Sequence, residues 1–311
     1  MSKIKVPSVT DLFKADVHLG HQIRRWNPRM EPFIYESRKG IHIINLEKTH
    51  ECLQSAAEFL YAIAKEGKQI IFVGTKRQVV DLIKIEAVYC GAMYVNQRWL
   101  GGTITNYSVI KNKIDKLANM DRKRKEGEFE KYTKKERLLL DREIEKLENS
   151  VGGLSAIKGR PAVLVVVDGR REKTAIHEAN IKNIPVVALI DTDTDPEGVA
   201  YPIPGNDDAI KSVSLILRTL SLAIEKGSID FAKGVEKAKE AEKAGGKIPE
   251  TEKVTKGEKQ EKVSGAEVET KAKSRKKVTK KADKTLPKTD KKAPEKKVKP
   301  TKKAKTPKAK K

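Results

Sequence analysis

Three arginines surround a tryptophan near the start of the chain, and this combination suits RNA. Arg24, Arg25 and Arg29 flank Trp26 within residues 18–49, where Gly20 and two prolines favour irregular chain. Guanidinium groups bind phosphate, and indole and guanidinium planes both stack on unpaired bases. In the alternative interpretation, Trp26 anchors the core beneath a loop whose arginines are merely solvated.

Two later loops carry related chemistry. Lys76 and Arg77 follow a glycine turn after an apolar strand at residues 69–73, and the turn is expected to open a helix running to about residue 89. Backbone N–H groups at such a helix start suit an anion. The chain contains neither GxxxxGK[ST] nor GxGxxG, which favours an RNA phosphate over a nucleotide. In the loop NQRWLGG, we expect Gln97 and Arg98 to contact RNA and Trp99 to pack against the domain.

Aspartates gather where ligands usually bind in α/β folds. They lie in the loops of DTDTDPEGVAYPIPGNDDA, after apolar strands. A Mg²⁺ or Zn²⁺ site, perhaps completed by His18 or His21, is one interpretation. Helix capping by Asp207 and turn formation by the Asp-Pro and Pro-Gly-Asn steps is the other. The candidate metal ligands are Asp191, Asp193, Asp207, Asp208 and His18, and Asp195 lies in the same stretch.

No catalytic set accompanies these residues. Cys52 and Cys90 are far apart and have no CxxC partner, which argues against a zinc knuckle or a disulfide framework. The five histidines show no HExxH spacing, and no serine lies in a nucleophile elbow. The rival hypothesis is an enzyme acting on a nucleotide or a phosphorylated small molecule in the α/β crevice, and the missing catalytic set argues against it. A cofactor is not expected.

A strand–helix–strand unit must position these loops. Residues 162–167 and 186–190 are apolar at every position, as in strands covered on both faces, and the segment 172–182 between them has helical spacing. This βαβ unit predicts the middle of a doubly wound, mainly parallel α/β sheet with helices on both faces, flavodoxin-like or Rossmann-like. The helix of this unit carries Ile176, Ala179 and Ile181 at roughly helical spacing. Further helices are expected at 8–15, 47–66 and 207–226, and further strands at 41–46, 93–95 and 201–203.

The segment at 103–157 differs from the rest of the sheet domain. Ile110, Ile114 and Leu117 form one narrow apolar seam, and a second seam follows a charged stretch around Gly127. The second seam consists of Leu140, Ile144, Leu147 and Val151. This pattern predicts an antiparallel α-helical coiled-coil hairpin, with an ordinary amphipathic helix pair as the alternative. Cations 122–125 near its tip could touch phosphate or form a solvated face.

Charge is concentrated at the end of the chain. The 311 residues carry a net charge of +23, and residues 234–311 hold 28 basic and 12 acidic side chains without an aromatic residue. We expect a disordered Lys-rich tail at 234–311 that attracts RNA nonspecifically. The basic body favours a polyanionic partner, although solubility alone could explain its charge. The start of the chain lacks a signal-like apolar core, no apolar run has membrane-spanning length, and a cytoplasmic protein without a membrane partner is expected.

Several long motifs resemble the bacterial-type small-subunit ribosomal protein uS2 family. They are GHQ, RRWNP, GIHII and LEKT near the start, then FVGTKRQ with NQRWLGGTITN, and finally PAVLVVVDGRREKTAIHEANIKNIPVVALIDTDTDP with YPIPGNDDA. The resemblance covers about residues 8–229. Asp16 departs from it, since the family usually has glycine there, which places the local turn in doubt.

The resemblance implies a structural, non-enzymatic component of the small (30S) ribosomal subunit that acts in translation. It implies binding to 16S-type rRNA and neighbouring ribosomal proteins, docking of ribosomal protein S1 where present, and a place between head and body near the mRNA exit. It also implies that the hairpin protrudes toward a neighbouring surface. We expect the α/β domain to comprise 1–102 and 158–233, with the hairpin inserted at 103–157.

Overall fold

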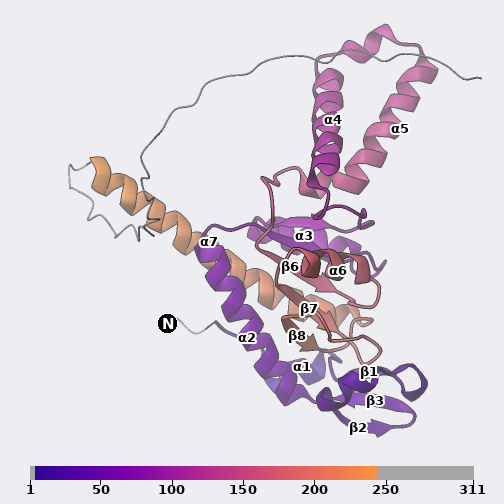
Figure 1. Cartoon of the computed structure of the whole chain (residues 1–311), viewed down its shortest axis with the longest axis vertical. Coiled ribbons are helices and arrows are strands. Elements are labelled where there is room, and N and C mark those ends of the chain that lie inside the picture. Colours follow the sequence, from indigo (N-terminus) through magenta and orange to yellow (C-terminus); the bar gives the residue numbers. More distant parts are fainter. Residues whose placement is uncertain (1–3, 244–311) are drawn as a thin grey trace, which may run out of the picture. The chain divides into compact units, whose positions relative to one another are not determined.

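Five parallel strands form the central sheet of the protein (Figure 1). The structure is a computed structural model that describes residues 4–243. The strand order is β5-β4-β6-β7-β8, so the predicted βαβ unit provides the central strand and its neighbour. This is the flavodoxin-like order, and the predicted parallel sheet is confirmed. The strands are β4 (Ile70–Val73), β5 (Met93–Val95), β6 (Val163–Val167), β7 (Val186–Ile190) and β8 (Tyr201–Pro204).

The strands are uniformly apolar because alternate side chains enter two different cores. In β6, Val163, Val165 and Val167 face one core, whereas Leu164 and Val166 face the other. Helices α2 (Leu46–Lys65), α3 (Val80–Cys90) and α7 (Ile210–Lys243) contribute to the first core. Helix α6 (Lys173–Ile181) contributes to the second. Helices therefore cover both faces of the sheet, as predicted.

The N-terminal segment contains a second sheet that the sequence pattern did not reveal. Strands β1 (Leu19–Gln22), β3 (Ile41–Ile44) and β2 (Ile34–Arg38) pair antiparallel in that order. Short 3₁₀ helices η1 (Ile23–Arg25) and η2 (Pro28–Phe33) connect β1 to β2. The residue pattern by itself predicted one strand here, at 41–46, and the family resemblance implied an aromatic-apolar strand before it. Strand β3 ends at Ile44, because Asn45 accepts the Glu47 N–H at 2.9 Å and caps α2.

Helix α1 (Val9–Lys14) and the turn after it agree with the sequence. Of the two N-cap candidates that the sequence offers, Ser8 and Thr10, Ser8 is the N-cap and forms a capping box with Asp11. Asp16, at the position where a glycine was expected, adopts a left-handed backbone with φ of 60°. Aspartate tolerates this conformation better than most residues, so the turn is formed in spite of the substitution.

Two α-helices occupy the predicted insertion (Figure 1). They are α4 (Tyr107–Lys125) and α5 (Lys134–Val151), joined through η3 (Glu128–Lys131) and followed by η4 (Gly152–Leu154). Ile110 and Leu117 of α4 are buried in one core with Ile144 and Val151 of α5. The predicted seams therefore pack together, whereas supercoiling of the pair and the boundaries at 103 and 157 stay predictions.

Helix α7 corrects two expectations. We expected a helix that ends before Gly227, but α7 continues to Lys243. A Cβ atom at Gly227 would lie 2.6 Å from the carbonyl oxygen of Tyr61 in α2, so this glycine permits close helix packing rather than ending the helix. The helix also enters the segment from residue 234 that we expected to be disordered. The rest of the predicted tail, from residue 244, lies outside the described residues.

Within residues 4–243, no helix is both long enough and apolar enough to cross a membrane.

Candidate functional site

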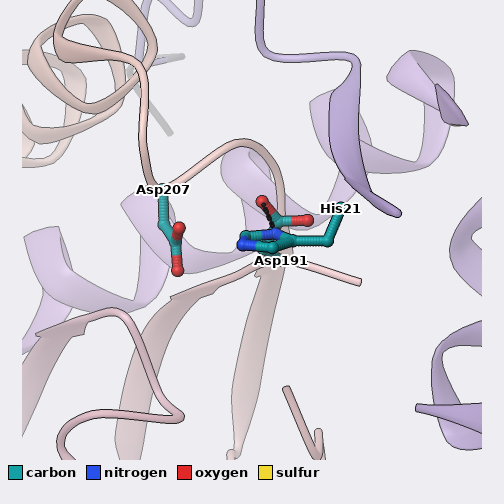
Figure 2. Close-up of side chains that lie close together, drawn as sticks. All are labelled: His21, Asp191 and Asp207. Atoms are coloured by element: carbon teal, nitrogen blue, oxygen red, sulfur yellow. Dashed lines mark ion pairs between the residues drawn. The ribbon is translucent and has the colours of Figure 1, made fainter. Parts of the chain in front are cut away.

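An acidic cluster lies at the carboxyl edge of the parallel sheet. Asp168 follows β6 and Asp191 follows β7, while Asp207 lies just beyond β8. The antiparallel sheet contributes His21 from β1, whose imidazole reaches toward Asp191 and Asp207 (Figure 2). Parallel strands bring their carboxyl ends to one edge, which explains how residues far apart in sequence meet here.

Lys76 is the cation at the centre of this cluster. Its Nζ lies 2.8 Å from Asp207 Oδ1, 2.6 Å from Asp208 Oδ1 and 3.7 Å from Asp168 Oδ2. Burial alone would lower the pKa of Lys76, but its hydrogen bonds to the two aspartates raise it. Burial and the negative charges of Asp168 and Asp191 raise the pKa of Asp207 to about 7, although Lys76 opposes this shift. The phosphate contact of Lys76 stays a prediction. In this structure its ammonium group forms ion pairs with Asp207 and Asp208.

His21 bridges the other carboxylates. Its Nδ1 lies 2.9 Å from Asp191 Oδ2, and its Nε2 lies 3.5 Å from Asp208 Oδ2 and 3.9 Å from Asp193 Oδ2. Hydrogen bonding to Asp191 raises the pKa of His21 to about 9, despite the opposing effect of burial. At neutral pH the imidazole is therefore protonated and forms ion pairs with the acidic cluster.

Three residues could hold a metal ion. His21, Asp191 and Asp207 each offer one ligand atom, and these atoms lie within 4.8 Å of one another. One imidazole and two carboxylates form a donor set suited to Zn²⁺. His18, a candidate from the sequence, is not part of this group and stacks on Phe13, with ring centroids 4.4 Å apart.

The expected anion site after β4 is occupied by a carboxylate of the protein. The Thr75 N–H and hydroxyl donate to Glu172 Oε1 at 3.1 and 2.5 Å. Glu172 is only 3% exposed. Helix α3 begins at Val80 and not directly after Arg77, so the expectation that the GTKR turn opens the helix was wrong. In flavodoxin-like folds, ligands bind between the strands that correspond to β4 and β6, and here Glu172 takes the donors that a phosphate would need.

The predicted RNA-binding arginines fall into two groups. Arg24, Arg25, Arg77 and Arg98 are exposed, and within residues 4–243 no ion pair joins them to a carboxylate. Arg29 is paired with Asp195 at 2.8 Å and with Glu197. The first group is therefore free to contact phosphate, whereas Arg29 links its loop to the segment after β7.

Trp26 and Trp99 differ in environment. Trp26 is half-buried and tilts over His42, with ring centroids 5.2 Å apart. Its stacking on RNA stays a prediction. Trp99 is buried and donates from Nε1 to Glu178 Oε1 at 3.1 Å, which confirms the expected packing role. The neighbouring Gln97 and Arg98 are exposed, as an RNA contact requires.

Glu178 is an important residue that the sequence pattern did not identify. Beside its bond from Trp99, its carboxylate accepts the N–H groups of Gly102, Ile104 and Thr105 at 2.8, 3.1 and 3.2 Å. Burial alone would raise the pKa of Glu178, but these hydrogen bonds lower it. Ile181, one of the apolar residues at helical spacing in this segment, is 55% exposed, whereas the charged Glu178 is buried. A signal was present, since Glu178 lies three residues from Ala175 on the buried face of α6.

Comparison with known proteins shows which family the chain resembles. The family model described as ribosomal protein S2 matches residues 12–227. The chain is 50% identical over 216 residues to small ribosomal subunit protein uS2 of Dictyoglomus thermophilum, covering 70% of the chain and 88% of the relative. It is 48% identical over 223 residues to uS2 of Buchnera aphidicola, covering 72% and 91%. It is 45% identical over 223 residues to uS2c of Cyanophora paradoxa, covering 72% and 96%.

Proposed function

Because the chain belongs to the ribosomal protein S2 family, we propose that it is a structural constituent of the small ribosomal subunit, bound to rRNA and neighbouring ribosomal proteins. The match over residues 12–227 carries this proposal. The exposed arginines without intramolecular ion pairs within residues 4–243 agree with it, because phosphate contacts supply much of the affinity for nucleic acids.

The enzyme alternative has no support from the relatives, whose names describe ribosomal proteins. Its expected site is also occupied, since Glu172 takes the donors of Thr75 and Lys76 pairs with aspartates. The finer parts of our proposal rest on the family resemblance. They are a cytoplasmic location, docking of ribosomal protein S1, and a protruding coiled-coil hairpin.

Replacing Arg24 and Arg25 together with alanine is expected to weaken incorporation into the small subunit. Both side chains are exposed and lie in or next to the 3₁₀ turn after β1. In competition during assembly, wild type should exceed the variant about tenfold at physiological salt, because two phosphate contacts are lost. Mass spectrometry of purified subunits measures this ratio. Lys65→Ala with Lys84→Ala is the control for an equal loss of charge, and equal incorporation of wild type and the arginine variant would contradict the assignment.

We also propose that His21, Asp191 and Asp207 bind Zn²⁺ or Mg²⁺, with Zn²⁺ favoured by the imidazole donor. Zn²⁺ at 100 times its Kd should stabilise the folded chain by about 2.7 kcal/mol. Thermal unfolding at increasing Zn²⁺ concentration measures this shift. His21→Asn should remove most of the shift, and the same shift in wild type and variant would exclude the site.

A further inference from the structure

A groove of about 870 Å³ lies between the loop after β5 and the helix pair α4–α5. It is distinct from the acidic cluster at the sheet edge. The loop contributes Gln97 and Arg98, and α4 contributes Lys113. The second half of α5 contributes Arg142 and Lys146.

The groove carries an excess of positive charge. Four cations line it against two carboxylates, Glu143 and Glu145. Glu143 is already neutralised by an ion pair with Lys116. In the part of the chain that the structure describes, no ion pair joins Lys113, Arg142 or Lys146 to a carboxylate. These three cations are therefore available to an anionic partner.

The cations are held on rigid supports. Trp99, next to Arg98, is fixed by Glu178, which also binds the backbone from residue 102 to residue 105. Arg142 and Lys146 are four residues apart, so they project from one face of α5 about 6 Å apart along its axis. Such spacing lets successive phosphates of one strand each meet a cation. The backbone that carries the cations is fixed before binding, so only side-chain freedom is lost when phosphates bind.

The remaining lining suits nucleobases. Leu100 and Leu147 are half-buried and offer apolar surface, and the exposed Gln97 and Asn149 carry amides with both donors and acceptors. Unpaired bases present apolar faces and hydrogen-bonding edges. RNA carries a phosphate on every nucleotide, whereas an acidic protein segment carries charge on only some of its residues, so the excess of cations favours RNA.

We propose that this groove binds an unpaired segment of RNA, with phosphates on Arg98, Lys113, Arg142 and Lys146 and a base over Leu100 and Leu147. The inference rests on the proposed ribosomal function and assigns the α4–α5 pair a direct RNA contact. Gln97 and Arg98 were expected to contact RNA from the sequence, whereas the helix cations emerge only from the fold.

The test uses the full chain and small subunits stripped of this protein. Arg142→Ala with Lys146→Ala should lower the affinity at least about tenfold at physiological salt. It should also reduce the slope of log K against log salt by about 1–2, because two phosphate contacts are lost. Lys65→Ala with Lys84→Ala, on helices of the other core, should leave the affinity unchanged. Hydroxyl-radical footprinting of the rRNA should show one protected segment that becomes exposed only with the groove variant.

Each outcome has one meaning. Lower affinity together with a lost rRNA footprint supports the groove as an RNA site. Lower affinity with an unchanged footprint would mean that an acidic protein segment occupies the groove, and unchanged affinity would mean that the groove has no binding role; either result overturns the inference while the ribosomal function stands. Failure of the wild-type chain to bind stripped subunits would instead overturn the proposed function.

Discussion

Glu178→Ala is expected to lower the free energy of unfolding by about 3–5 kcal/mol, the largest effect of any single substitution considered. The carboxylate is 5% exposed and holds the loop that carries Arg98 through donors from Trp99, Gly102, Ile104 and Thr105. Alanine would leave these donors without an acceptor, and buried unpaired donors are costly. Chemical denaturation at pH 7 measures the change.

The pH dependence provides a second test of Glu178. Its folded-state pKa is lowered, so its stabilisation is present above the unfolded value of about 4.3 and is lost as pH falls through the lower folded value. The difference between wild type and Glu178→Ala should therefore shrink below about pH 4. His177→Ala, an exposed neighbour on α6, should change stability by less than about 0.5 kcal/mol. A loss below about 1 kcal/mol for Glu178→Ala would contradict the structural role.

Lys76→Met should destabilise the fold by about 3 kcal/mol at pH 8. The substitution keeps the length of the side chain but removes the ammonium between Asp207 and Asp208, so the buried Asp207 carboxylate loses its ion pair. Denaturation in the presence of excess EDTA measures the loss without competition from metal ions.

The loss caused by Lys76→Met should become smaller as the pH falls. The pKa of Asp207 is raised to about 7 in the wild type, so protonation below that pH stabilises the folded state relative to the unfolded chain. Without Lys76 the pKa of Asp207 rises further, and the variant loses stability more steeply above pH 7. Arg77→Ala is the matched control, because Arg77 is exposed and carries the same charge. A loss that is equal at pH 5.5 and pH 8 would contradict this account.

Local patterns were sufficient to predict the central sheet. Uniformly apolar runs such as Val163–Val167 and Val186–Ile190 identify parallel strands, because both faces of each strand are covered. The apolar seams at Ile110 and Ile144 likewise predicted two packed helices. The antiparallel sheet was missed because its strands are short and lie among glycine and proline residues.

The partners within the site could not be predicted in the same way. Lys76 meets Asp207 across 131 residues, and Glu178 meets Gly102 across 76. Cationic residue type indicated a phosphate contact for Lys76, but only the fold shows that aspartates surround it. Similarly, a glycine is a residue type that often ends a helix, so Gly227 suggested a helix end. Its close approach to Tyr61 shows instead that it lets α7 pack closely against α2.

The most direct test of the central claim is sedimentation of cell lysate through sucrose gradients at low and then high monovalent salt, following this chain. We predict about one copy per small subunit at both salt concentrations, because the folded body makes specific contacts that resist screening. Complete release at high salt, while other ribosomal proteins remain bound, would contradict the claim. Attraction would then come mainly from the Lys-rich segment beyond residue 243, since nonspecific binding of a polycation is lost as salt rises.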